Sequence, residues 1–397
     1  PKVSDFQVQY IHSQPEMFLI EPGKQLRIGI RLLQEPVLAL VALRYGIEWQ
    51  IWYNAVKKID GDCRVADLAA ARVAVRFMEL IPDDDRAELH ARFPNDLKDL
   101  YSIFKSPEVS LANLEGIDLA EISKYHRLEA PDHPINEAWL PIIEQLAVPT
   151  EALMMSGGDL RLNIETKNLL NVYGCRPFPR PEAFSFASST ATSVSNLAFD
   201  ITQKQREKLI QDCFKNGLAE TYRAQQSHLF DRLRQSLHLG KNSALIISPS
   251  GTDISLLFAG ICQSLTDKTV CHILVASDET GSGVPMALAG KHFADTSALN
   301  FSVKKESKID GFRDAEVLKI PLRNSSGELK TRQVLDSEVQ TAIQEAFAKG
   351  SQPVLHVMDQ SKLGYAAPTQ SLLEKIRQEY GDKILVLVDN SQLRMHT

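Results

Sequence analysis

The spacing of apolar residues changes character along the chain. In the first part, apolar residues recur every three or four positions over residues 38–56 and 65–81, and more weakly over 97–104. This spacing places them on one face of a helix, so it predicts three helices. Residues 6–20 are predicted to form a short strand or an extended arm. Residues 1–150 are therefore predicted to be a mainly helical accessory domain.

Prolines and small polar residues dominate the next part of the chain. Residues 127–190 contain seven prolines, and a run rich in serine and threonine follows at 188–193. A long polar segment between periodic regions is either a linker or a functional surface, and composition leaves both interpretations open. Residues 151–199 are predicted to be a loop-rich connecting segment on the substrate side of the next domain.

From residue 200 onward, helical patterns alternate with short apolar runs. A helical stripe covers residues 209–237 and ends at Gly240. The predicted strands are 244–247, 272–276, 353–358 and 384–388; the predicted helices are 251–265, 284–293, 334–348 and one from the N-cap Thr369 to Gly381, and a polar, hairpin-like region spans 301–332. Uninterrupted apolar strands alternating with helices indicate a mostly parallel sheet with helices on both faces. The predicted fold class is α/β, with residues 200–397 as the large domain.

The overall composition limits which classes of partner and site are expected. The chain has 397 residues, 44% of them hydrophobic and 24% charged, with a formal net charge of −6. It contains no Lys/Arg run longer than two, so nucleic acid and anionic membrane surfaces are not expected partners. Its five cysteines form no CxxC pair, which favours free thiols over a disulfide framework or a zinc site. Without an apolar run of membrane-spanning length or a leader pattern, the sequence predicts a cytoplasmic protein.

Two turns of the predicted sheet carry possible ligand-binding residues. In an open parallel sheet, ligands bind outside the carboxyl ends of the strands. Ser250-Gly251-Thr252-Asp253 opens a helix there, and the unpaired N–H groups of a helix start can hold a phosphate, although the same residues are also ordinary caps. Glu279-Thr280-Gly281-Ser282-Gly283 is similar to the start of a dinucleotide fingerprint, but Met286 stands where the third glycine is needed.

Two further turns follow the later strands. Asp359-Gln360-Ser361-Lys362-Leu363-Gly364 comes after the strand that contains His356, and Asp389-Asn390-Ser391-Gln392 comes after the last strand. A carboxylate placed directly after five apolar residues is partly desolvated, so it requires a cation or strong hydrogen-bond donors. Alternatively, Asp389 caps whatever structure follows it.

The order of these turns resembles that of the fold-type I pyridoxal-phosphate enzymes, particularly the class V aminotransferase and cysteine desulfurase branch. Gly251-Thr252 is similar to the family's phosphate-binding turn. Residues 356–364, with Pro368, are similar to its later Asn- or Ser-containing turn, and Asp389 with Gln392 matches its Asp-x-x-Gln motif. The resemblance covers roughly residues 170–397.

The resemblance implies a role for each matched residue. Asp389 is expected to hold the pyridinium N–H of pyridoxal phosphate, with Gln392 and Ser361 near the phenolic oxygen. Ser250, Gly251 and Thr252 are expected to bind the phosphate. Thr280 and His356 are candidates to replace the aromatic or histidine that the family stacks on the ring. Segments 171–176 and 188–192 correspond to loops that contact substrate in the family.

The implied function is a pyridoxal-phosphate-dependent transferase or lyase that acts on an amino acid or amine, as a homodimer without a metal. One departure is that no lysine follows Lys383, whereas the family's Schiff-base lysine lies beyond the aspartate. Either the chain is a fragment, or it does not hold the cofactor covalently; Lys362 is expected to play a surface or supporting role. The alternatives are a non-catalytic scaffold or regulator with the same fold and, more distantly, a nucleotide-binding oxidoreductase that uses Gly281 and Gly283.

Overall fold

The chain forms two compact units. The computed structural model describes residues 7–11, 18–21, 25–29, 36–59, 62–81, 84, 86–87, 136–156, 162–165, 167–180, 183, 193–240, 242–297 and 301–391. The first unit, called the helical unit here, comprises Pro1–Ser156 and Arg161–Leu245, and the second, called the α/β unit, comprises Gly157–Leu160 and Ile246–Thr397. Within the described residues, the helices lack the combination of length and apolar character that crossing a membrane requires.

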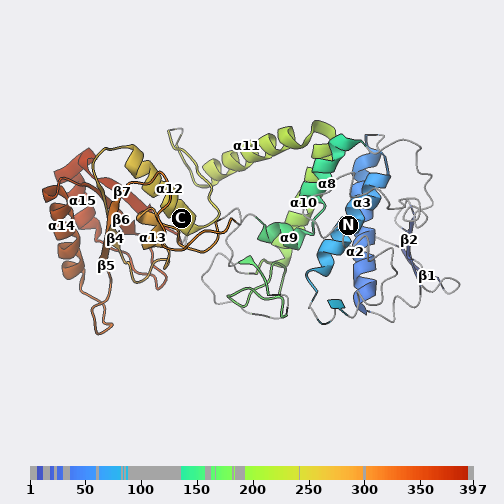
Figure 1. The fold of residues 1–397 in the computed structure, drawn as a ribbon, viewed down its shortest axis with the longest axis horizontal. Coiled ribbons are helices and arrows are strands. Elements are labelled where there is room, and N and C mark those ends of the chain that lie inside the picture. The colour runs from blue at the N-terminus through green and yellow to red at the C-terminus, as the bar shows by residue number, and fades with distance from the viewer. Residues whose placement is uncertain are drawn as a thin grey trace. The chain divides into compact units, whose positions relative to one another are not determined.

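Helices make up most of the described part of the helical unit (Figure 1). They are α2 (Pro36–Lys57), α3 (Arg64–Met78), the 3-10 turn η2 (Glu137–Trp139), α8 (Leu140–Leu146), α9 (Thr150–Met155), α10 (Asn196–Asn216) and α11 (Leu218–Ser236). A small sheet precedes them, formed by β1 (Gln7–Ile11), β2 (Phe18–Glu21) and β3 (Gln25–Gly29). Strand β3 lies in the middle, parallel to β1 and antiparallel to β2. The predicted helix at 97–104 lies outside the described residues.

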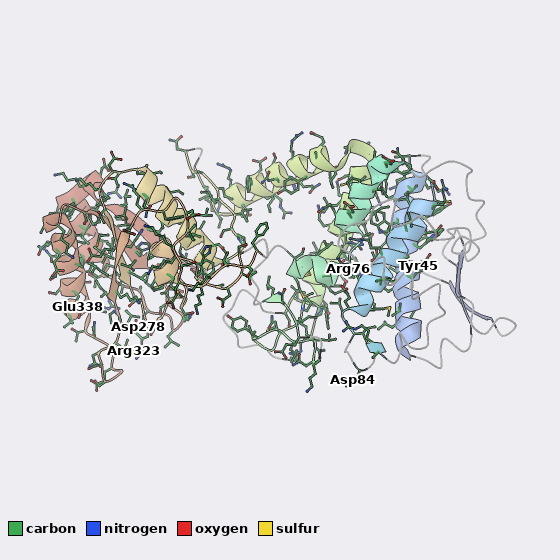
Figure 2. All side chains as sticks on the ribbon, viewed as in Figure 1. Tyr45, Arg76, Asp84, Asp278, Arg323 and Glu338 are labelled. Atoms are coloured by element: carbon green, nitrogen blue, oxygen red, sulfur yellow. The ribbon has the colours of Figure 1, made fainter. Side chains whose placement is uncertain are left out.

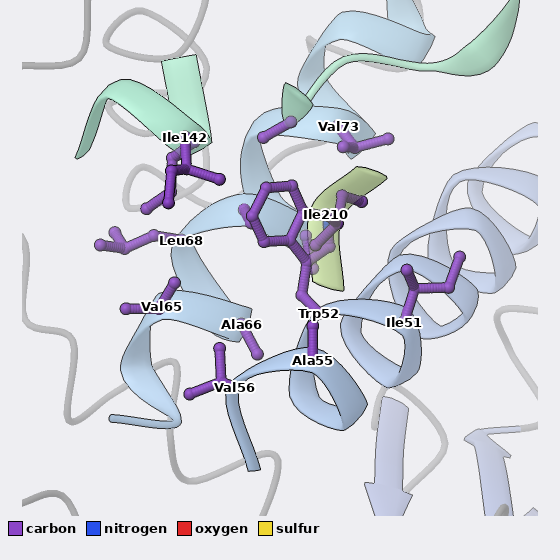
Figure 3. Packing of buried hydrophobic residues seen from close by; sticks show 14 of the residues in the cluster. Ile51, Trp52, Ala55, Val56, Val65, Ala66, Leu68, Val73, Ile142 and Ile210 are labelled. Carbon is purple, nitrogen blue, oxygen red and sulfur yellow. The ribbon is translucent and has the colours of Figure 1, made fainter. Parts of the chain in front are cut away.

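One apolar cluster holds the helices α2, α3, α8 and α10 together (Figure 3). Trp52 of α2 is fully buried, and its ring meets Phe214 of α10 edge to face, with 5.9 Å between centroids. Leu68 and Ile143 are also fully buried and come from α3 and α8. Because aromatic rings remove large areas from water, these contacts are a main source of stability for the helical unit.

A buried ion pair crosses the same core. Both terminal nitrogens of Arg206 on α10 donate to the carboxylate of Glu48 on α2, each at 2.8 Å, and the guanidinium also donates to the carbonyl of Leu146. Arg44 lies 3.3 Å from Glu48 and also binds Glu151 of α9. Burial alone raises the pKa of Glu48, but the charges of Arg206 and Arg44 outweigh this effect, so the pKa lies below its ordinary value.

The predicted helical stripe at 209–237 is two helices rather than one. Gly217 separates α10 from α11 with φ at +83°, a backbone conformation that glycine adopts without strain. Both helices belong to the helical unit, because Ile210, Cys213 and Phe214 of α10 are part of its core. The main segment of the α/β unit therefore begins at Ile246, and the prediction that this domain begins at residue 200 is wrong.

The α/β unit contains a sheet of four parallel strands in the order β5-β4-β6-β7. The strands are β4 (Val270–Val275), β5 (Ala315–Ile320), β6 (Gln352–Met358) and β7 (Leu385–Asp389); the helices are α12 (Gly251–Ser264), α13 (Val284–Leu288), α14 (Arg332–Ala348) and α15 (Gln370–Tyr380), with a 3-10 turn η4 (Gly381–Lys383). The prediction of an α/β fold with a parallel sheet is thereby confirmed at this level.

Helices lie on both sides of the sheet (Figure 1), and alternate residues of the central strands pack against different helices. Cys271 and Leu355 pack on one face in a cluster with residues of α14 and α15. Val270 and Val354 face the other side and meet Cys262 of α12, while Leu274 meets α13. The two central strands are therefore covered on both faces, which is why the sequences of β4 and β6 are almost continuously apolar.

Three further predicted elements differ from the structure. Residues 244–247 form no strand, and Ile246 and Ile247 are 50% and 55% exposed. No strand among the described residues pairs with this segment, so its backbone makes no inter-strand hydrogen bonds that would hold it in a sheet. The region 301–332 was predicted to be hairpin-like, but it contains β5, a parallel strand at the edge of the sheet. The charged residues Glu316 and Lys319 interrupt the apolar pattern of this strand. The predicted helix 284–293 ends at Leu288, shortly before Gly290, whose φ is +67°.

Candidate functional site

The strand order identifies one edge of the α/β sheet as the candidate ligand site. From β4 the chain passes to β5 on one side, and it later returns to the other side of β4 as β6. The order reverses between β4 and β6, and open α/β sheets bind ligands outside the carboxyl ends of the strands at such a point. The loops that follow β4 and β6, residues 276–283 and 359–368, lie at this place.

A buried carboxylate connects three of the loops at this edge. Glu279, after β4, is 6% exposed and accepts a hydrogen bond from the hydroxyl of Ser361, after β6, at 2.5 Å. Its other oxygen lies 3.2 Å from the guanidinium of Arg323, after β5. Asp278 accepts from the backbone N–H groups of Leu322 and Arg323, and Figure 2 shows Asp278 and Arg323 close together. These hydrogen bonds and the ion pair thus connect the loops at the carboxyl ends of β4, β5 and β6.

The start of α12 packs against the loop after β4. A Cβ atom added to Gly283 would lie 3.0 Å from the side chain of Thr252 and 3.1 Å from Phe293. A Cβ on Gly281 would lie 3.3 Å from Val284. These two glycines are therefore needed for close packing between α12 and its neighbours. The predicted phosphate turn therefore lies next to the switch-point loop.

The first turn of α12 has free hydrogen-bond donors. Ser250 is the N-cap: its hydroxyl accepts from the N–H of Asp253 and donates to the Asp253 carboxylate at 2.6 Å. The N–H groups of Gly251 and Thr252 have no acceptor among the described residues. A Cβ on Gly251 would meet nothing within 4 Å, so the space beside it is open. The site offers two N–H donors, while Ser250 is engaged as a cap.

Asp389 ends strand β7 on the α12 face of the sheet. Leu385 packs with Val354 and with Cys262 of α12, and alternation along the strand puts Asp389 on that same side. The carboxylate is half-buried, and its Oδ1 accepts from the N–H and hydroxyl of Ser391. Its Oδ2 has no partner in the part of the chain that the structure describes, so it remains able to accept a hydrogen bond.

Two histidines lie side by side inside the sheet below this edge. Nδ1 of His272 on β4 is 2.9 Å from Nε2 of His356 on β6, and the two residues are 0% and 4% exposed. Burial lowers the pKa of His272 to about 3, with a further contribution from His356, and burial lowers the pKa of His356 to about 4. Both rings are therefore neutral at physiological pH.

The other predicted site residues have mixed placements. Ser361 is 1% exposed, and its hydroxyl is already engaged by Glu279 and by the N–H of Tyr365. Thr280 is buried, and its carbonyl accepts from the Nζ of Lys362, which fits the supporting role expected of that lysine. Gln392 and residues 188–192 lie outside the described residues. Segment 171–176 is a tight turn of the helical unit, organised by the Asn171 side chain, which accepts from the N–H groups of Tyr173 and Cys175.

Sequence reasoning missed Glu279, Arg323 and His272. Glu279 begins the glycine-containing loop after β4, but nothing in its spacing indicates that Ser361, 82 residues later, would donate to it. Arg323 lies in a region predicted to be hairpin-like. One signal was available for His272: it interrupts an otherwise apolar strand, as His356 does, and buried polar groups require partners.

Among the described residues, no group of three or more His, Cys, Asp or Glu side chains is arranged to hold a metal ion. All five cysteines are free. Comparison of the chain with protein-family models, with curated proteins and with solved structures finds no match. The functional argument therefore depends on the chain's own residues.

Proposed function

We propose that the carboxyl edge of the α/β sheet binds pyridoxal phosphate, and that the protein is a transferase or lyase acting on an amino acid or amine. The observation that carries the proposal is two sets of groups on one face of one sheet that no described residue fills: the N–H donors of Gly251 and Thr252, and Oδ2 of Asp389. The two N–H donors suit a phosphate, and the carboxylate oxygen of Asp389 suits a protonated ring nitrogen.

The start of α12 suits a phosphate for two reasons. The N–H groups of Gly251 and Thr252 point out of the helix start, where the helix dipole favours an anion. The open space beside Gly251 also allows close approach to the backbone. Asp253 already places one negative charge in this turn, but Ser250 engages it. Two charge-assisted hydrogen bonds of about 1.5–3 kcal/mol each are available to the phosphate.

Asp389 supplies the negative charge for the ring. Ser391 holds Oδ1 with two hydrogen bonds, which fixes the carboxylate and leaves Oδ2 for a pyridinium N–H. A half-buried carboxylate is a stronger partner for a cation than an exposed one, because water screens it less. When bound, pyridoxal phosphate supplies an electron sink that stabilises negative charge on a substrate's alpha carbon, and the Asp389 carboxylate keeps the ring nitrogen protonated for that purpose.

The nucleotide-binding alternative has less support. The side chains of Val284, Thr252 and Phe293 fill the space beside Gly281 and Gly283, the glycines that would form a dinucleotide turn. The helix that follows them, α13, contains only five residues and provides a weak dipole. A non-catalytic scaffold with the same fold would lack the unfilled donors and acceptor, or would leave them unused.

Titration of the chain with pyridoxal phosphate tests the proposal. The wild-type chain is expected to bind the cofactor with a change in its absorbance spectrum. Asp389→Asn removes the charge from Oδ2 and is expected to weaken binding roughly 10- to 100-fold, the value of one hydrogen bond between charged groups. Equilibrium dialysis with absorbance detection measures both quantities.

Asp382→Asn is the matched control for this substitution. Asp382 is an exposed aspartate in η4, just before β7 begins, so it removes the same charge from the opposite end of the strand. The control should bind pyridoxal phosphate as the wild type does. A wild-type chain that does not bind the cofactor, or equal weakening by both substitutions, would show that the proposal is wrong.

A further inference from the structure

The histidine pair inside the α/β sheet is an unusual feature of its core. His272 and His356 occupy neighbouring parallel strands and face α12 and α13, on the side where Val270, Leu274 and Val354 lie. His356 is third from the end of β6, directly below the switch-point edge. Buried histidines without a charged partner are costly, so their hydrogen bonds must be accounted for atom by atom.

Only one arrangement of protons satisfies both rings well. Each neutral ring carries one proton, and one N–H bridges Nδ1 of His272 and Nε2 of His356. The remaining nitrogen of His272, Nε2, is enclosed and has no partner among the residues that the structure describes. An enclosed N–H without an acceptor costs more than an enclosed lone pair, so the His272 proton belongs on Nδ1, where it donates to His356.

The proton of His356 is then fixed as well. Because Nε2 of His356 accepts from His272, its own proton must reside on Nδ1. That nitrogen makes no hydrogen bond to the described residues, and 4% of His356 remains accessible. A neutral imidazole with its proton on Nδ1 is a hydrogen-bond donor that does not add charge to the site.

We infer that His272 is a positioning residue that locks His356 as a neutral Nδ1–H donor, directed to an acceptor atom of a ligand at the switch point. The identity of that ligand as pyridoxal phosphate rests on the proposed function; the proton arrangement does not. The ring of His272 acts only through His356, since its own second nitrogen is sealed in the apolar core.

Nuclear magnetic resonance of the ¹⁵N-labelled chain tests the proton arrangement directly. Long-range ¹H–¹⁵N correlation spectra at pH 7 should show protonated Nδ1 and unprotonated Nε2 in both His272 and His356. His228, which is exposed on α11, serves as an internal reference for an unconstrained ring. A protonated Nε2 on His272 would overturn the inference, and this measurement needs no substitution.

Two substitutions separate positioning from a purely structural role. His272→Asn keeps an amide N–H near the place of Nδ1, so His356 should retain its Nδ1 proton. His272→Leu removes the donor, so the hydrogen bond that selects the Nδ1–H tautomer of His356 is lost and both tautomers of that ring should be populated. If both variants lose stability but the His356 tautomer stays the same in His272→Leu, the positioning role is wrong. If His272→Leu does not fold, the wild-type and His272→Asn spectra still decide the tautomer.

Pyridoxal phosphate serves as the ligand probe. Its addition should move the Nδ1 resonance of His356, and His272→Leu should weaken binding roughly tenfold while His272→Asn preserves it. If the chain binds no cofactor while the spectra show the expected protons, the proposed function fails and the locked pair stands. If the cofactor binds without moving the His356 resonance, the ligand-directed role of His356 is wrong.

Discussion

The two units of the chain bury polar groups in different ways. In the helical unit, both oxygens of Glu48 are bonded to Arg206, and Arg206 donates two further hydrogen bonds to the carbonyl of Leu146. In the α/β unit, Asp389 and the first turn of α12 keep bonding capacity that no described residue fills. The helical unit also has buried atoms without a partner among the described residues, such as Oε1 of Gln50 and Nε1 of Trp52, both on α2.

The difference shows how a structural polar group is distinguished from one that awaits a ligand. A buried charge that is fully paired stabilises one packing arrangement and leaves nothing for a partner. Unfilled donors and acceptors at the carboxyl edge of a parallel sheet are placed where ligands bind. The following predictions test whether the two kinds of polar group respond differently to substitution and to pH.

The largest effect is expected from the buried ion pair. Arg206→Met should lower the free energy of unfolding of the helical unit by about 3–5 kcal/mol, because it leaves the buried Glu48 charge without its main partner. All three tryptophans, Trp49, Trp52 and Trp139, belong to the helical unit, so tryptophan fluorescence during urea unfolding reports on this unit alone. The double variant Glu48→Met with Arg206→Met should recover much of the loss. A loss below 1 kcal/mol in Arg206→Met would contradict the role of the pair.

The second effect concerns pH. The folded pKa values of His272 and His356, about 3 and about 4, lie below the ordinary 6.5, so the unfolded chain binds protons first as pH falls. The two histidines therefore contribute to the stability of the α/β unit fully above about pH 6.5, and this contribution decreases toward pH 4. The expected loss in the free energy of unfolding is about 2–4 kcal/mol by pH 5.

The helical unit provides the comparison for this experiment. The pKa of Glu48 is lowered from its ordinary value of 4.5, so the contribution of Glu48 to stability is present above pH 4.5. It is lost only as the pH falls below that value. Urea unfolding at pH 7, 6 and 5 should therefore move the circular dichroism transition of the α/β unit while the tryptophan transition stays in place. Equal movement of both transitions would show that the histidine pair is not the cause.

A smaller effect is expected from the carboxylate that connects the loops. Glu279→Gln removes the charge that faces Arg323 and weakens the bond from Ser361, with an expected cost of about 1–2 kcal/mol. Amide hydrogen exchange should increase locally in residues 321–323 and 359–365, whereas the central strands stay protected. Unchanged exchange in both loops would mean that Glu279 does not hold them.

The smallest effect is expected on the surface of the helical unit. Lys208 and Asp212 form an ion pair one helical turn apart on α10, and the Lys208 side chain is 60% exposed. Asp212→Asn should change the free energy of unfolding by less than about 0.5 kcal/mol, because water screens exposed pairs. This substitution is the baseline against which Arg206→Met is judged in the same fluorescence assay.

Several elements could be predicted because their signals are local. Thr369 caps α15 by accepting from the N–H of Leu372, and Gly381 ends that helix with φ at +52°, as the sequence indicates. Strand β6 was predicted within one residue, since a buried strand is a short apolar run between turns. Strand β5 was missed because an edge strand exposes charged residues such as Lys319, which weakens the apolar pattern.

The candidate site was predictable only in part. The positions of Asp389 and Gly251-Thr252 at turns follow from the strands and helices around them. Their bonding state does not, since it depends on Ser391, on Ser250 and on which oxygens these residues leave unused. The roles of Gly281 and Gly283 in packing against Thr252 and Phe293 were likewise invisible in the sequence, because those contacts form only when α12 meets the loop after β4.

The sequence by itself determined the helix caps, the apolar strands β4, β6 and β7, and the presence of a parallel sheet, because these depend on hydrogen bonds and side-chain periodicity within a few residues. Only the tertiary structure decided the strand order, the contact between His272 and His356 across 84 residues, and the pairing of Glu48 with Arg206 across 158. Such partners are selected when distant segments are desolvated together, and buried polar groups must then bond to whatever the fold places beside them.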